Sequence, residues 1–262
     1  MKKEKLNYSN WVPANIMKFL WSLSGVILII FIFSRLYWRN LIIQIIIGIL
    51  FLILITMAIY MQICRCIFSF NGGKLMEKFY DFLIEKLKWS GNGTLIDIGC
   101  GSGALSIKCA KHFPKASIIG IDYWGKEWNY SKNQCENNAK IEGVLEHITF
   151  QRGDAAKLDF PSEYFDAAVS NFVFHEVRNE ADKRFVVKEA LRVVKKGGAF
   201  AFHDLFEQKH LYGNIEIFLE ELKRDGISEI HYISHTESLH FIPTICKAPW
   251  MLKNMGLIYG IK

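Results

Sequence analysis

A glycine-rich stretch follows a short apolar segment in the sequence Thr94-Leu-Ile-Asp-Ile-Gly-Cys-Gly-Ser-Gly103. The apolar residues Leu95–Ile98 predict a strand, and Ala104–His112 predicts a helix. A strand, a glycine-rich bend and a helix in this order form a nucleotide-binding βα unit. The glycines let the backbone turn tightly and approach a ligand, and the helix N-terminus offers unpaired N–H groups to it.

The spacing of the glycines separates two classes of ligand. A nicotinamide or flavin enzyme has the pattern G-x-G-x-x-G/A, which Gly99, Gly101 and Ala104 fit loosely. Here Gly103 adds a third glycine at alternate spacing, and Asp97 lies two residues before the first. A carboxylate at this point suits a ligand with a positive charge and suits pyrophosphate poorly. A nucleotide-linked oxidoreductase is therefore the weaker alternative.

The chain after residue 70 alternates between strand-like and helix-like segments. Besides Leu95–Ile98, the expected strands are Ser117–Ile121, Ile148–Arg152, Phe165–Ser170, Gly198–His203, Ile227–Ile233 and Gly256–Ile261. Besides Ala104–His112, the expected helices are an amphipathic one from Leu75 to Leu87, Lys126–Glu142, Ala181–Val194 and Asn214–Lys223. Such alternation predicts an α/β fold with a doubly wound, mostly parallel seven-stranded sheet.

Two apolar runs precede this region. Phe19–Phe33 is almost continuously apolar, and Leu41–Ile63 is long enough to span a bilayer, which takes about 20 residues. They predict a transmembrane α-hairpin that contacts the lipid bilayer through residues 17–63. No small-x-small cleavage site follows the first run, which argues against a signal peptide. The absence of a polar stripe argues against a buried soluble hairpin, while an interfacial or re-entrant hairpin remains an alternative.

The charges around the two runs predict their orientation. Seven lysines and arginines flank the outer ends of the runs, whereas only Arg35 and Arg39 lie in the turn between them. Cytoplasmic flanks are enriched in these residues, so both ends should be cytoplasmic. Asn71-Gly72-Gly73 marks the expected boundary between a membrane domain, residues 1–70, and a catalytic domain, residues 71–262. We therefore expect a multi-pass protein of the cell membrane with its catalytic domain in the cytoplasm.

Candidate binding residues lie at the carboxyl ends of the expected strands, where ligands bind in such sheets. Asp122 ends the second strand about 20 residues after the glycine turn, where a carboxylate can accept both ribose hydroxyls. Tyr123 or the adjacent Trp124 is expected to lie against an adenine ring. Asp154 and Ala155 follow the third strand, and Asn171 follows the fourth.

These elements, in this order from Thr94 to Asp204, resemble the class I S-adenosylmethionine (SAM)-dependent methyltransferases, most closely the type 11 group that includes quinone-biosynthesis C-methyltransferases. The resemblance implies SAM as cofactor and transfer of its methyl group in an SN2 step without a metal. It implies that the loop cradles the methionine part of SAM, through Asp97, Gly99, Cys100, Gly101 and Gly103. It also implies that Asp154 binds the adenine amino group and that the backbone N–H of Ala155 meets the ring.

The acceptor of the methyl group is less constrained. His175 and His203 follow the fourth and fifth strands and are the candidate general bases, with His175 the first choice. Asn171-Phe-Val-Phe174 lacks the prolines found in nucleic-acid amino-methyltransferases, so no nucleic-acid partner is expected despite the net charge of +6. The apolar anchor favours a hydrophobic or lipid-like small-molecule acceptor. The alternatives are an anchor that only localises the enzyme, and a membrane-tethered SAM-binding scaffold without catalysis.

Overall fold

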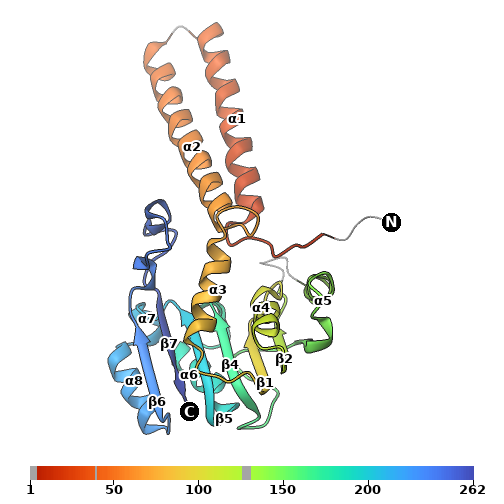
Figure 1. Ribbon diagram of the computed structural model, residues 1–262. Coiled ribbons are helices and arrows are strands. Elements are labelled where there is room, and N and C mark those ends of the chain that lie inside the picture. Colours follow the sequence, from red (N-terminus) through yellow and green to blue (C-terminus); the bar gives the residue numbers. More distant parts are fainter. Residues whose placement is uncertain (1–4, 39, 126–130) are drawn as a thin grey trace. The chain divides into compact units, whose positions relative to one another are not determined.

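The computed structural model describes residues 5–38, 40–125 and 131–262, which form two compact units (Figure 1). One unit is Ser9–Met76. The other combines Met1–Tyr8 with Glu77–Lys262, so a segment that precedes the apolar helices belongs to the same unit as the sheet.

The unit Ser9–Met76 is built from two long apolar helices, α1 (Ala14–Tyr37) and α2 (Leu41–Phe68). Asn40 begins α2 by accepting hydrogen bonds from the N–H groups of Ile42 and Ile43, as expected for an N-cap residue. Both helices are long and apolar enough to cross a membrane, by length and composition. Only 11% and 6% of their most apolar windows are buried, so most of these side chains have no protein cover in the structure.

Gln44 links the two helices next to the turn. Its side-chain amide donates to the backbone oxygen of Trp38, at 2.8 Å, and accepts from the Arg35 guanidinium, at 3.2 Å. At the other end of the unit, the side-chain amide of Asn10 donates to the backbone oxygen of Arg65, at 2.9 Å. The main polar interruption of the second apolar run is thus hydrogen-bonded within the hairpin.

The second unit contains a seven-stranded sheet with the order β3-β2-β1-β4-β5-β7-β6. The strands are β1 (Gly93–Ile98), β2 (Ala116–Asp122), β3 (Ile148–Arg152), β4 (Phe165–Asn171), β5 (Val194–Asp204), β6 (Glu229–Ile233) and β7 (Gly256–Ile261). Strands β1 to β5 are parallel, and β7 pairs antiparallel with both β5 and β6. This confirms the expected mostly parallel, doubly wound sheet.

Helices cover both faces of the sheet. They are α3 (Leu75–Lys86), α4 (Ala104–His112), α5 (Lys132–Ile141), α6 (Lys183–Arg192), α7 (Lys209–Tyr212) and α8 (Ile215–Arg224). From β1 the chain moves outward through β2 to β3, and it then returns to build β4 and β5 on the other side of β1. Because parallel crossovers are right-handed, this reversal puts α4 and α5 on one face and α6 on the other.

The bounds of three elements, α6, β5 and α5, differ from the sequence-based expectations. The helix expected to reach Val194 ends at Arg192, and β5 begins at Val194 instead of Gly198. The register of β5 against β4 shifts between Phe165 and Ala167, because a bulge at the exposed lysines and Gly197 takes up the extra residues. The helix expected from Lys126 is described from Lys132, with Ser131 as its N-cap, and 126–130 lie outside the described residues.

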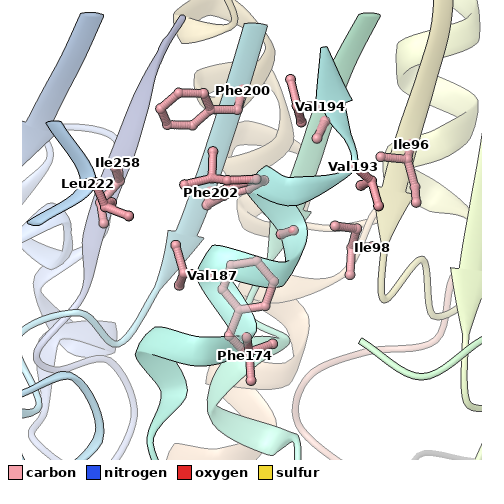
Figure 2. Packing of buried hydrophobic residues seen from close by; sticks show 14 of the residues in the cluster. Ile96, Ile98, Phe174, Val187, Val193, Val194, Phe200, Phe202, Leu222 and Ile258 are labelled. Carbon is pink, nitrogen blue, oxygen red and sulfur yellow. The ribbon is translucent and has the colours of Figure 1, made fainter. Parts of the chain in front are cut away.

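The main core packs against the sheet on the side of α6 and α8 (Figure 2). Phe200 and Phe202 are two residues apart on β5, so their side chains point to the same face of the sheet. The rings of Phe202 and Phe174 meet edge to face, with their centres 5.3 Å apart. Phe174 and Phe202 are fully buried in this cluster. They are therefore part of the hydrophobic core.

Replacing Phe202 with alanine should therefore lower the free energy of unfolding by about 3–5 kcal/mol, because it leaves a cavity in a close-packed core. Phe185→Ala on α6 is the matched control, since Phe185 is 61% exposed and a surface change is expected to stay within about 0.5 kcal/mol. Denaturant unfolding of the detergent-solubilised chain, followed by near-ultraviolet circular dichroism, measures both. Equal midpoints for the two variants would contradict this assignment of the core.

Candidate active site

The carboxyl ends of the parallel strands form one edge of the sheet, and its order reverses between β1 and β4. Ligands bind at such a reversal because the crossovers leave in opposite directions and open a crevice. The expected cofactor residues follow β1, β2, β3 and β4, which are adjacent in the sheet. The fold therefore brings these four sets of residues to one edge.

The loop after β1 can only be built from glycine at two positions. Gly99 has φ +75°, and a Cβ there would lie 2.2 Å from a methyl group of Val173. Gly103 has φ +81° at the N-cap of α4, and a Cβ there would lie 3.0 Å from the Phe150 ring. Both positions combine a left-handed backbone with a close neighbour, so any side chain would displace the loop.

The peptide groups of Gly101 are held on both sides. Its N–H donates to Oδ2 of Asp122, at 2.8 Å, and its carbonyl oxygen accepts from the Trp124 indole, at 3.0 Å, and from the Cys135 thiol, at 3.1 Å. The other oxygen of Asp122 accepts from the N–H of Trp124, at 2.7 Å. Burial raises the pKa of Asp122, and the two backbone donors oppose that shift. Asp122 therefore connects the glycine-rich loop with the end of β2.

Asp97 lies beneath this loop at the end of β1, with only 1% of its surface exposed. Its Oδ2 accepts a hydrogen bond from the Ser106 hydroxyl, at 2.5 Å. Burial raises the pKa of Asp97 to about 7, although the bond from Ser106 opposes the shift. A buried carboxyl group without a cationic partner gains most from a ligand that brings positive charge, and SAM carries an ammonium and a sulfonium group. The donor set of the loop thus fits SAM.

The residues after β2 and β3 form the neighbouring part of the edge. Tyr123 is exposed, and the Arg152 guanidinium lies 4.7 Å from the centre of its ring. Asp154 accepts from the N–H of Ala156, at 2.9 Å, and from the side-chain amide of Asn179, at 2.7 Å. Ala155 lies between Asp154 and Ala156, which this hydrogen bond joins in one turn. The two carboxylate oxygens of Asp154 therefore each hold one bond and keep a further lone pair.

A buried polar chain runs from β4 to β5. Nδ1 of His203 lies 3.0 Å from Oδ1 of Asn171, and its Nε2 lies 2.8 Å from the hydroxyl of Thr236. Burial lowers the pKa of His203 to about 3, so its imidazole is neutral at physiological pH. The amide nitrogen of Asn171 is buried without a hydrogen-bond partner. An unpaired buried donor is costly, so this group is available to an acceptor atom of a ligand.

His175 has the opposite charge state. Burial disfavours its protonated form, but the charge of Asp204 and a 2.7 Å contact with its carboxylate outweigh this and raise the pKa of His175 to about 10. Glu176, at 3.4 Å, adds to the effect. Asp204 is fully buried and also accepts from the N–H of Phe174, at 2.8 Å. At neutral pH His175 is therefore an imidazolium ion that balances a buried carboxylate.

Aromatic side chains surround His203 on its other sides. The ring of Phe172 lies 4.5 Å from that of His203, and Phe79 on α3 lies 5.4 Å from it. Phe241 contacts both Phe79, at 5.6 Å, and Phe82, at 6.1 Å. Phe172 has φ +57°, a conformation that is strained for a bulky residue and that is concentrated at functional sites.

Several of these residues had no signal in the sequence. Ser106 and Cys135 lie on helices among ordinary surface and core positions, and Thr236 lies in a loop between β6 and β7. They were found only because packing brings them to Asp97, Gly101 and His203. Phe79 belongs to the apolar face of an amphipathic helix. This pattern predicts that Phe79 is buried, but it does not predict that Phe79 packs against His203.

Two histidines near the C-terminus, His231 and His235, take part in local pairs. His231 lies 2.6 Å from Glu229 and stacks on Tyr259, and His235 lies 3.1 Å from Glu237. Within residues 5–38, 40–125 and 131–262, no group of three histidine, cysteine or acidic side chains is arranged to hold a metal ion.

Comparison with known proteins gives matches to this region. Residues 96–202 match the type 11 family model described as a methyltransferase domain. An uncharacterized protein of Haemophilus influenzae is 31% identical over 157 residues, which are 60% of this chain and 57% of that protein. The ubiquinone/menaquinone biosynthesis C-methyltransferase UbiE of Geotalea daltonii is 27% identical, over 50% of this chain and 55% of that enzyme. The chain thus matches just over half the length of both relatives.

A solved structure shows a likeness over a larger share of the chain. Geranyl diphosphate C-methyltransferase from Streptomyces coelicolor, in complex with Mg²⁺, geranyl diphosphate and S-adenosyl-L-homocysteine, superposes with a TM-score of 0.55. The alignment covers 72% of this chain and 80% of that one at 14% identity, which speaks for the fold alone. The family match falls on the strands and loops that build the glycine-rich site, so residues 96–202 are similar to the methyltransferase domains of the type 11 family.

Proposed function

We propose that this protein is a membrane-anchored enzyme that transfers the methyl group of SAM to a small, hydrophobic or lipid-like acceptor. The observation that carries the proposal is the set of aromatic rings around a neutral, buried His203 at the end of β5, on the same edge of the sheet as the loop that fits SAM. Phe172 and Phe241 in this set are only partly buried, and their apolar rings favour an apolar acceptor over a charged one.

The names of similar proteins support this class of acceptor. The Geotalea relative is named for ubiquinone and menaquinone biosynthesis, and the Streptomyces structure holds geranyl diphosphate. Quinones with prenyl tails and prenyl diphosphates share long apolar chains. The two apolar helices agree with an acceptor that resides in a bilayer, although they also agree with an anchor that only localises the enzyme.

SAM supplies an electrophilic methyl group, which a nucleophilic atom of the acceptor takes in one displacement while sulfur keeps the bonding electrons and the acceptor releases a proton. We assign Asp97 to the positive methionine end and Asp122 to the ribose. Asp154 and the backbone of Ala155, with Tyr123, are assigned to the adenine. Positioning and exclusion of water are the protein's main contributions to such a reaction.

His203 is our candidate for receiving the proton of the acceptor, because its imidazole is neutral at physiological pH. Burial lowers its pKa to about 3, so His203 would hold this proton only transiently before passing it on. His175 already carries a proton up to about pH 10, so it is better suited to hold Asp204 and the turn after β4 than to act as a base. The unpaired amide N–H of Asn171 is a suitable donor to an oxygen atom of either SAM or the acceptor.

The two basic flanks and the segment Met1–Tyr8 support a hairpin with both ends on one side. Seven basic residues flank the outer ends of the apolar runs and two lie in the turn. Residues 5–8 belong to the same unit as the sheet, so the N-terminal segment and the catalytic domain share a compartment. We propose that this compartment is the cytoplasm.

The affinity for SAM should rise with pH between 5.5 and 7.5, by roughly tenfold, because only ionised Asp97 pairs with the cation. The folded-state pKa of about 7 exceeds the ordinary value of 3.8. The ligand-free protein should therefore lose stability as the pH rises through this interval, and SAM should reverse the loss. Calorimetric titrations of the full chain with SAM at several pH values measure the effect.

Asp97→Asn is the matched control, since it keeps the side chain's size and removes its charge. It should bind SAM weakly at every pH in the series. A flat pH profile for the unmodified protein would contradict the assignment of Asp97.

Membranes that contain the full chain should transfer a labelled methyl group from SAM into material that organic solvent extracts. Asp122→Ala should greatly reduce the label, because it removes the partner of the Gly101 N–H, whereas Asp159→Ala should not, because Asp159 is exposed. Label that appears only in aqueous or protein fractions would contradict a lipid-like acceptor. SAM binding without any transfer would favour the non-catalytic scaffold.

Reporter fusions at Asn40 and at the C-terminus should give opposite compartments, with the C-terminus cytoplasmic. Alkaline phosphatase and green fluorescent protein fusions to the full chain report the two sides. Cytoplasmic signals from both sites would indicate an interfacial or re-entrant hairpin.

A further inference from the structure

A short segment ahead of α1 lies against the glycine-rich loop. The N–H of Asn7 donates to Oδ1 of Asn138 on α5, at 2.9 Å, and the amide of Asn138 donates back to the carbonyl oxygen of Asn7, also at 2.9 Å. Asn138 is fully buried, although it is polar and lies in the middle of a helix. A buried amide is retained at low cost only when its groups are paired, and Asn7 provides two of these pairs.

The same amide of Asn138 also donates to the carbonyl oxygen of Ser102, at 3.0 Å. The hydroxyl of Ser102 in turn donates to the carbonyl oxygen of Tyr8, at 2.9 Å. The hydroxyl of Ser102 is therefore bonded to the N-terminal segment, and its carbonyl oxygen is bonded to Asn138, the residue that holds this segment. Ser102 itself is buried, so water does not replace these bonds readily.

Further contacts hold the segment in place. The phenol of Tyr8 donates to Oε1 of Glu142, at 2.9 Å, and the side-chain amide of Gln134 donates to the carbonyl oxygen of Asn7, at 2.6 Å. Glu142 also pairs with Lys111 at the end of α4. Asn7 and Tyr8 thus contact α5 and the loop, and they are joined through Glu142 to α4.

We propose that Asn7 and Tyr8 form a strap that holds the glycine-rich loop in the shape that binds SAM, with Asn138 as the positioning residue between strap and loop. Asp122, Trp124 and Cys135 hold Gly101 from one side, and the strap holds the next residue, Ser102, from the other. The segment that leads into the membrane helix is thereby part of the cofactor site. The strap depends on the SAM site and is independent of which acceptor is methylated.

Asn7→Pro tests the strap, because proline lacks the N–H that Asn138 accepts and leaves the loop's own residues unchanged. We expect the dissociation constant of the full chain for S-adenosylhomocysteine to rise about tenfold, the usual result of losing a buried hydrogen bond and leaving its partner unpaired. Calorimetry of the detergent-solubilised protein measures it. Lys5→Pro, outside this network, is the matched control and should bind like the unmodified chain.

A double-mutant cycle separates positioning from general destabilisation. Ser102→Ala removes the hydroxyl that bonds Tyr8, and its effect on S-adenosylhomocysteine affinity should be smaller in the Asn7→Pro background than alone. Ser102→Thr keeps the hydroxyl and should restore most of the affinity. Hydrogen exchange of the loop amides 99–103 should accelerate in Asn7→Pro, while the amides of β4 and β5 should exchange as in the unmodified chain.

Unchanged affinity in Asn7→Pro, or strictly additive effects in the cycle, would overturn the strap. Equal acceleration of exchange in the loop and in β4 and β5 would also overturn it, because it would show a general loss of stability and no specific effect on the loop. In each of these cases the unmodified chain still binds S-adenosylhomocysteine. A failure of the cofactor assignment is distinguishable, since the unmodified chain would then not bind the ligand at all.

Discussion

The clamp on the peptide groups of Gly101 is the interaction on which the site depends. The glycines of the loop have no side chains with which to fix it, so its shape depends on its neighbours. Asp122 at the end of β2 holds the N–H of Gly101, and Trp124 and Cys135 hold its carbonyl oxygen. One carboxylate thus joins the loop after β1 to the end of β2, and it is the residue that we assign to the ribose of SAM.

Two buried histidines beside β4 and β5 have opposite charge states because their neighbours differ. Both lose hydration, which by itself disfavours a positive charge. His175 lies 2.7 Å from the carboxylate of Asp204 and stays protonated, whereas His203 faces neutral partners, Asn171 and Thr236, and stays neutral. The structure therefore holds a neutral imidazole and an imidazolium ion that balances a buried carboxylate, although the sequence presents two similar residues.

The apolar helices impose a separate constraint. A soluble protein that exposed this many leucines, isoleucines and phenylalanines would associate or aggregate. Their backbone groups are satisfied within each helix, which is the requirement for a segment in lipid. One unit of the chain thus has an apolar exterior, and the other has an aromatic set around His203. These two features are the basis of our proposal of a hydrophobic acceptor.

Much of the fold was predictable because it depends on local sequence. Apolar runs bounded by glycine or polar residues placed all seven strands to within a few residues, except at β5, where the bulge at Gly197 made the strand begin at Val194. The loop glycines and Asp122 were recognisable from their spacing alone. Phe174 and Phe202 were harder to place, because an apolar residue at a strand end is equally compatible with the core and with a site.

The sequence by itself determined the order of the elements, the two long apolar helices and the strand ends that carry polar residues. These follow from hydrophobic periodicity and from backbone freedom, which act over a few neighbouring residues. Only the tertiary structure decided that Asn7 meets Asn138, that His175 pairs with Asp204, and that Phe79 covers His203. Such contacts join residues far apart in the chain, and the pKa values depend on burial that exists only after the chain has packed.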